Sequence, residues 1–76
     1  MEQILGEFAT EEVKRLTLLQ LETSMKEEQA AIDAYRRRAD YARRGYPAIA
    51  IMLDHIRGEE EEHLREISRE VNRLKK

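Results

Sequence analysis

Apolar residues recur along this chain at steps of three and four positions, which is the period of an amphipathic helix. They fall on two lines, and no stretch shows the strict alternation of a strand. The first line contains Leu18, Leu21, Met25, Glu28, Ile32, Tyr35, Ala39 and Ala42. The second line contains Ile49, Met52, Ile56, Glu60, His63, Ile67, Val71 and Leu74. The pattern predicts two helices and an all-α fold.

Glycine and proline mark the point at which these two helices would meet. Glycine often ends a helix in a left-handed cap, and proline is accepted in the first turn of the next helix. Thr10 is a residue type that caps helix N-termini. The sequence therefore predicts one domain over residues 1–76: a helix over about 10–44, a turn at 45–46 and a helix over about 47–74. Residues 1–9 fit either a short helical lead-in or a disordered tail.

Each apolar line is interrupted at its middle by residues that are costly to bury. Glu28 interrupts the first line, and Glu60 and His63 interrupt the second. A buried carboxylate without a partner is unfavourable, so such positions usually indicate a partner, a metal ion or a raised pKa. We therefore take these three residues as candidate ligands of a metal ion.

Composition narrows the possible classes of protein. With 76 residues and no cysteine, the chain has a small core and neither disulfides nor thiolate metal sites, so it needs another source of stability such as a metal or a partner chain. Its 14 basic and 16 acidic residues give a net charge of −2, which predicts no general attraction to nucleic acid or membranes. An acidic N-terminus and the lack of a long apolar run predict a cytoplasmic protein.

Glu60 and His63 form a Glu-x-x-His pair, and this spacing places both side chains on one helix face, one turn apart. A carboxylate and an imidazole together suit iron or manganese. In di-iron helix bundles, two helices each provide one Glu and two others each provide Glu-x-x-His. One hairpin would supply half of that set, and a two-fold dimer would supply all of it. The same spacing also fits a solvated acidic run with a boundary histidine.

Two longer segments carry a resemblance to a known family. Residues 27–40, EEQAAIDAYRRRAD, resemble the first-helix motif of encapsulated ferritin-like proteins, in which a ligand Glu precedes a Tyr by seven positions. Residues 53–63, LDHIRGEEEEH, are similar to the second-helix motif of that family. Rubrerythrins share a looser version of both motifs. The resemblance covers roughly residues 24–67, which is most of the chain.

The resemblance implies a two-helix antiparallel hairpin that dimerises into a ferritin-like four-helix bundle. The metal ligands of the family fall on Glu28, Glu60 and His63, and a tyrosine near the metal falls on Tyr35. The implied activity is ferroxidase: Fe(II) is oxidised by oxygen at a di-iron site, with two ions in each homodimer, for iron storage or detoxification. Members form ring-like oligomers and work inside encapsulin shells, so a shell is a candidate partner. Ala30 replaces a Glu of the family's metal-uptake site, and residues 72–76 lack a Gly/Ser/Leu-type targeting tail.

Two other functions remain open at this point. One is a rubrerythrin-like peroxide reductase, although the Cys-x-x-Cys iron domain of that family is absent. The other is a non-enzymatic helical module that mediates assembly. Outside the candidate ligands, we expect Glu59, Glu61 and Glu62 to face solvent and His55 to be a structural or surface residue. We expect the basic residues at 36–38 and 43–44 to pair with acidic groups of a neighbouring subunit rather than with nucleic acid.

Overall fold

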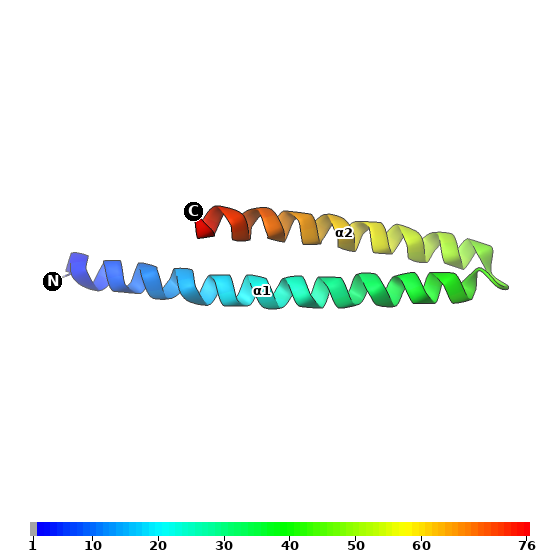
Figure 1. The fold of residues 1–76 in the computed structure, drawn as a ribbon, viewed down its shortest axis with the longest axis horizontal. Helices are drawn as coiled ribbons and strands as arrows, with labels where there is room; N and C mark the ends of the chain where they lie inside the picture. The colour runs from blue at the N-terminus through cyan, green and yellow to red at the C-terminus, as the bar shows by residue number, and fades with distance from the viewer. Residues whose placement is uncertain (1) are drawn as a thin grey trace.

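The computed structural model describes residues 2–76, with side chains described for residues 10–76. It contains two helices, α1 (Glu2–Ala42) and α2 (Pro47–Lys75), and no strand within that range. Helix α2 folds back along α1, so the chain forms an antiparallel hairpin that measures 66 × 15 × 15 Å (Figure 1). The all-α, two-helix prediction is thereby confirmed. Neither helix has a stretch that is both long and apolar enough to cross a membrane.

The start of α1 differs from the prediction. The helix already begins at Glu2, so Thr10 lies inside it and does not act as an N-cap. Residues 2–9 are mostly strong helix formers such as Glu, Gln, Leu and Ala, and the single Gly6 is tolerated inside a helix at a cost of about 1 kcal/mol. The sequence is compatible with either a helical lead-in or a disordered tail before residue 10. The backbone of residues 2–9 is helical. Because α1 has 41 residues and α2 has 29, α1 extends well past the end of α2 (Figure 1).

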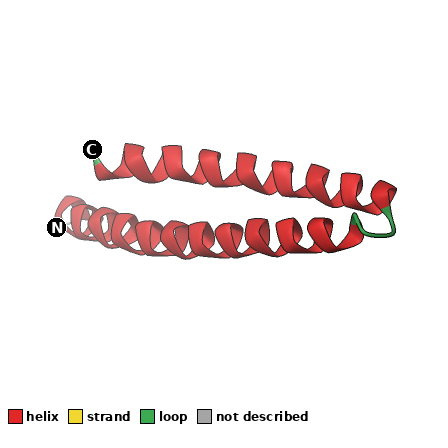
Figure 2. Ribbon diagram, turned by 45° about the vertical axis from the view of Figure 1, so that its right-hand side comes forward, coloured by secondary structure: helices red, strands yellow, loops and turns green. Residues whose placement is uncertain are grey.

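A short turn at residues 43–46 joins the two helices (Figure 2). The amides of Arg44 and Gly45 donate to the carbonyls of Tyr41 and Ala42, so the last turn of α1 tightens as it ends. No glycine in the described residues has a positive φ, so the predicted left-handed cap is absent. Tyr46, at φ −135° and ψ 71°, lies outside the helical region that a following proline disfavours, and Pro47 opens α2 as predicted.

Side chains spaced seven residues apart fill the contact between the helices, as in other paired helices. The central line of α1 contains Leu18, Met25, Ile32 and Ala39, and the central line of α2 contains Ala50, Arg57, Leu64 and Val71. Among residues 10–76, the buried apolar residues are Ile32, Ala39, Ala50 and Val71. Two of these four are alanines, so the hairpin buries little apolar area by itself.

Two further lines flank each central line and give the hairpin two unlike edges. We call one the ion-pair edge. It contains Glu22, Gln29 and Arg36 of α1, Arg43 at the start of the turn, and Asp54, Glu61, Ser68 and Lys75 of α2. We call the other the apolar edge. It contains Leu21, Glu28, Tyr35 and Ala42 of α1 and Leu53, Glu60, Ile67 and Leu74 of α2.

The residues of α2 that pack most closely against α1 are not those of the predicted apolar line. The centre of the contact is shifted by about one residue in the sequence, from Ile49 to Ala50. Ile49 and Met52, which begin the predicted line, are 45% and 53% exposed. They lie outside the apolar edge, whereas Ala50 lies at the centre of the contact. The apolar residues of α2 therefore include some that contact α1 and others that form an exposed strip, which no other part of the described chain covers.

Candidate metal centre

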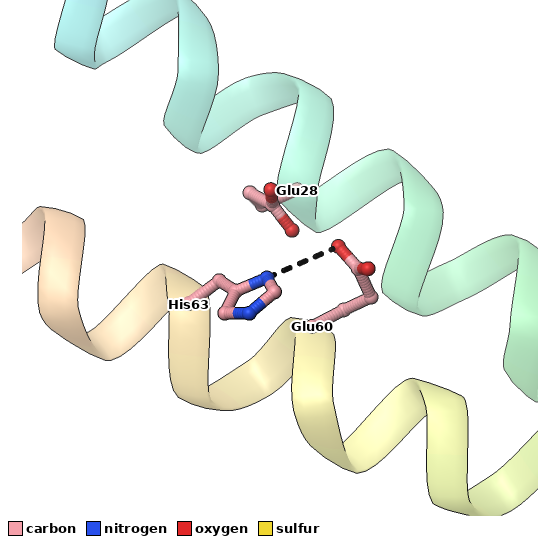
Figure 3. Close-up of side chains that lie close together, drawn as sticks. All are labelled: Glu28, Glu60 and His63. Carbon is pink, nitrogen blue, oxygen red and sulfur yellow. Dashed lines mark ion pairs between the residues drawn. The ribbon is translucent and has the colours of Figure 1, made fainter.

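The three predicted ligand residues come together between the helices. Glu28 comes from α1, and Glu60 and His63 come from α2 (Figure 3). One ligand atom from each residue lies within 4.8 Å of the other two, and Nδ1 of His63 lies 3.9 Å from a carboxylate oxygen of Glu60. Glu28 and Glu60 are half-buried, and the side chain of His63 is 53% exposed.

The local sequence explains how these side chains meet. Glu28 and Glu60 both lie on the apolar edge, on facing helices. His63 follows Glu60 by three residues, so it lies one helical turn further along and on the same side of α2. The group is therefore built on two continuous helices, which hold side chains more rigidly than loops do.

The electrostatics of Glu28 are those of a carboxylate that lacks a counter-charge. Its pKa is raised above the ordinary range, first because the Glu60 carboxyl group is close enough to share a proton with it, and then because of partial burial and charge repulsion from Glu60. One of its oxygens, Oε2, is buried and has no hydrogen-bond partner in the described residues. A cation between Glu28 and Glu60 would offset the repulsion between the two carboxylates and give the unpaired oxygen of Glu28 a partner.

The run of four glutamates at positions 59–62 divides into groups with different partners. Glu59 contacts Nε2 of His55 at 2.8 Å. Glu61 accepts a hydrogen bond from Arg57 at 2.5 Å, and Glu62 accepts one from Arg65 at 2.6 Å, which lowers the pKa of Glu62. Glu60 has no arginine or lysine partner among the described residues and points toward Glu28 and His63. Within this run, Glu60 is therefore the carboxylate that lies together with possible metal ligands from both helices.

The prediction that Glu61 faces solvent is wrong. Glu61 is half-buried on the ion-pair edge and lies 3.9 Å from Arg36 of α1, in addition to its contact with Arg57. Glu59 and Glu62 are exposed as predicted. The predicted apolar line places Glu61 on the outer side of α2. The observed contact is centred on Ala50, Arg57, Leu64 and Val71, which brings Glu61 to its edge.

Arg57 was not singled out by the sequence analysis, although it lies at the centre of the contact. Its Nη1 donates to Glu61, its Nε lies 3.7 Å from Asp54, and that Nε is buried without a hydrogen bond to any described residue. The spacing of four residues between Arg57 and Glu61 is the signal that could have identified this pair. Arg57 therefore neutralises the charge of Glu61, whereas Glu60 has no basic partner and lies beside Glu28 and His63.

Tyr35 and His55 lie outside the group of three. Tyr35 follows Glu28 by seven residues on the apolar edge, which is on the order of 10 Å along α1. It is half-buried, and the guanidinium of Arg38 lies 5.5 Å from the centre of its ring. Its catalytic role stays a prediction. His55 is a surface residue, 76% exposed and paired with Glu59, as expected.

Two arginines of the basic cluster find their partners inside the chain, not in a neighbouring subunit as the sequence analysis expected. Arg43 donates to Asp54 of α2 at 2.7 Å and also pairs with Asp40. Arg36 lies 3.9 Å from both Asp33 and Glu61. Both arginines belong to the ion-pair edge and help to join α1 to α2.

Comparison with the models of known protein families, with curated proteins and with solved structures found no match to this chain. The family resemblance of its two motifs therefore rests on their residues alone. What the structure adds is the placement of Glu28, Glu60 and His63 within reach of one metal ion.

Proposed function

We propose that two copies of this chain form a homodimer that binds two iron ions and oxidises Fe(II) with molecular oxygen. The observation that carries the proposal is the group of Glu28, Glu60 and His63, whose ligand atoms lie within 4.8 Å of one another. Two such groups would give the four carboxylates and two histidines of a di-iron helix bundle.

The residues present fit iron as a ligand set. Carboxylate oxygen is a hard donor and imidazole nitrogen a borderline one, a mixture that suits Fe(II) and Mn(II). The four carboxylates of a dimer would balance the charge of two divalent ions. The buried and unpaired Oε2 of Glu28 supplies a lone pair that lacks a partner in the chain. His63 must be neutral to bind, so iron binding should weaken as His63 becomes protonated.

Each ligand has a distinct part in this proposal. Glu60 approaches both Glu28 of α1 and His63 of α2, so it is the candidate that would bridge two ions (Figure 3). His63 would be a terminal ligand, and its exposure leaves it open to solvent and to oxygen. Two ferrous ions held by these residues would each give up one electron and become ferric, and the two electrons with two protons from water would reduce oxygen to hydrogen peroxide.

The test uses protein purified without oxygen and loaded with Fe(II). We expect one iron per chain, and a ferric absorbance that rises when oxygen is added. Glu62→Gln is the matched control, because Glu62 pairs with Arg65 on the exposed side of α2. An iron content or oxidation rate for Glu60→Gln that equals that of Glu62→Gln would contradict the proposal.

A second arm of the same experiment replaces oxygen with hydrogen peroxide. A ferroxidase should oxidise iron readily with oxygen, whereas a rubrerythrin-like reductase should react preferentially with peroxide. The ring-like assembly and the encapsulin shell implied by the resemblance stay predictions, and so does cytoplasmic localisation.

A further inference from the structure

We propose that the turn end of the hairpin, residues 36–52, docks on membranes whose surface contains anionic phospholipids. Its exposed aromatic and aliphatic side chains enter the headgroup region, and its unpaired arginines lie among the lipid phosphates. The metal group has no part in this contact, because Glu28 lies about 20 Å from Tyr41 along α1.

The first argument is the exposure of apolar and aromatic side chains at this end. Tyr41, Tyr46 and Ile51 are 73%, 68% and 71% exposed, which makes them the three most exposed large apolar or aromatic residues among residues 10–76. They come from the last turn of α1, the connecting turn and the first two turns of α2, which together close one end of a rod 15 Å wide (Figure 1). Exposed apolar side chains gathered at one place are typical of a contact surface.

The second argument is the charge of the same end. Residues 36–52 contain five arginines and one acidic residue, Asp40, so their net charge is +4. The rest of the chain has a net charge of −6, because the total is −2. The near-neutral total, which predicted no general attraction to membranes, therefore conceals a basic end that attracts an anionic surface locally.

Three of the five arginines have no acidic partner within the described chain. Arg36 and Arg43 form ion pairs with α2. Arg37, Arg38 and Arg44 are exposed, and none of them forms an ion pair with a described residue. We call these three the unpaired arginines. A guanidinium group can donate two parallel hydrogen bonds to a phosphate, which suits it to phospholipid headgroups.

The third argument identifies the partner as a lipid surface. A flat bilayer can contact the side chains around a narrow end together. Tyrosine and arginine are residues that anchor proteins at the headgroup level, and an isoleucine such as Ile51 can enter the apolar layer below. A single-stranded nucleic acid would stack bases on the tyrosines, but the guanidinium of Arg44 already lies 5.4 Å from the ring centre of Tyr41. Acidic groups of a neighbouring subunit, which the sequence predicted as partners, would neutralise the arginines and leave the apolar side chains uncovered.

The experiment measures co-sedimentation of the full chain with phospholipid vesicles. Vesicles of phosphatidylcholine alone are compared with vesicles that contain about one third phosphatidylserine. We expect binding to the anionic vesicles to be tighter by at least about ten-fold, since each unpaired arginine adds about five-fold and the acidic remainder of the chain opposes part of this gain. High salt should remove the difference, because it screens the surface charge.

Two matched pairs of variants locate the contact on the hairpin. Arg37→Gln should weaken binding about five-fold, whereas Lys26→Gln removes one charge from an exposed site in the middle of α1 and should leave binding nearly unchanged. Ile51→Ser should weaken binding about five- to ten-fold, whereas Val13→Ser, at an exposed site far from the turn, should not. All four side chains are exposed, so the variants should fold, and circular dichroism checks this.

A fluorescent label tests whether the turn end enters the lipid. Because the chain has no cysteine, Ile51→Cys and Val13→Cys each accept one label whose emission depends on the polarity around it. The emission of the label at position 51 should shift to shorter wavelength on anionic vesicles. The label at position 13 should keep its emission in water.

Several outcomes would overturn the proposal: no binding to anionic vesicles, equal binding to both kinds of vesicle, or equal losses in a variant and its control. Tighter binding to a single-stranded oligonucleotide than to anionic vesicles would identify the partner as nucleic acid instead. Loss of self-association in Arg37→Gln, followed by analytical sedimentation, would assign the unpaired arginines to a contact between subunits.

Discussion

At the scale of single residues, neighbouring glutamates on α2 have different environments and should respond differently to substitution. Glu60 faces Glu28 and His63, and Glu61 pairs with Arg57. Glu60→Ala should lose nearly all bound iron and oxidation without lowering the stability of the metal-free chain. Glu61→Ala should keep the iron site and lower the free energy of unfolding by about 1–2 kcal/mol, because it removes the hydrogen bond that the half-buried Arg57 donates through Nη1.

The measurement for this pair is iron content and oxidation rate beside thermal unfolding of the same samples. Tyr35→Phe serves as a third variant, and we expect it to keep its iron and to slow oxidation only modestly. Equal loss of iron in Glu60→Ala and Glu61→Ala would show that the ligand assignment on α2 is wrong.

Glu28 should make the stability of the metal-free protein depend on pH. Its folded pKa is raised, so above the pKa of the unfolded chain the folded state holds more protons than the unfolded state does. Stability should therefore fall as pH rises from about 4.5 through the raised pKa of Glu28, and remain low above it.

Glu28→Gln is the variant that checks this pH dependence. It removes the titrating group, so its free energy of unfolding without metal should be flatter between pH 4.5 and neutrality. It should also be more stable than the unmodified chain at neutral pH, measured by denaturant unfolding. A metal-free chain that is most stable at neutral pH, with the same profile in Glu28→Gln, would contradict the repulsion described for this site.

At the scale of the helices, Gly58 should limit the stability of α2. It lies in the middle of the helix, and a Cβ added there would meet no atom within 4 Å. Gly58→Ala should raise the free energy of unfolding by about 0.5–1 kcal/mol, because glycine loses more backbone entropy than alanine does. Thermal unfolding should show a gain of a few degrees.

Ala30→Gly is the matched control, since Ala30 is exposed in the interior of α1 and should show a loss of similar size. Gly58 lies beside the ion-pair edge. A destabilised Gly58→Ala that also fails to assemble would therefore mean that another chain packs over this side of the hairpin.

The sequence predicts the helices well and their exact ends less well. Gly45 and Pro47 locate the turn, because both residue types have strong backbone preferences. Thr10 misleads, because a capping residue only permits a helix to start, and the helix-forming residues before it extend α1 to Glu2. The Glu-x-x-His spacing and the position of Glu28 within an apolar line suffice to predict that Glu28, Glu60 and His63 come together.

The environment of Glu61 could not be predicted in the same way. An apolar line predicts that a face is covered, but it does not state whether the cover comes from the same chain or from another one. Ile49 and Met52 show this on α2, where they are exposed beside the buried Ala50. The sequence does not give the angle by which α2 is turned about its own axis relative to α1. The pairing of Glu61 with Arg57 and Arg36 depends on that angle.

At the scale of the whole molecule, metal should strengthen the association of two hairpins. In a dimer without metal, Glu28 and Glu60 of each chain would lie near their symmetry mates, and like charges at short distance repel. Chelation of iron should therefore weaken the dimer by about ten-fold or more in Kd, which corresponds to about 1.4 kcal/mol.

Analytical sedimentation with Fe(II) and with a chelator provides the measurement for the metal dependence. The double variant Glu28→Gln with Glu60→Gln should dimerise to the same extent under both conditions, because it lacks the repelling charges. A dimer of the unmodified chain whose Kd is indifferent to iron would refute this coupling.

Because one edge of the hairpin is charged and the other is apolar, the protein should respond differently to different salts. The ion pairs that join the helices are largely exposed, so sodium chloride should screen them and lower the melting temperature of the single hairpin. Sodium sulfate at the same ionic strength screens similarly, yet it favours burial of apolar surface and should promote the association of two hairpins. Circular dichroism melts and sedimentation in the two salts should therefore diverge, with the hairpin loosened in both and the dimer favoured in sulfate alone.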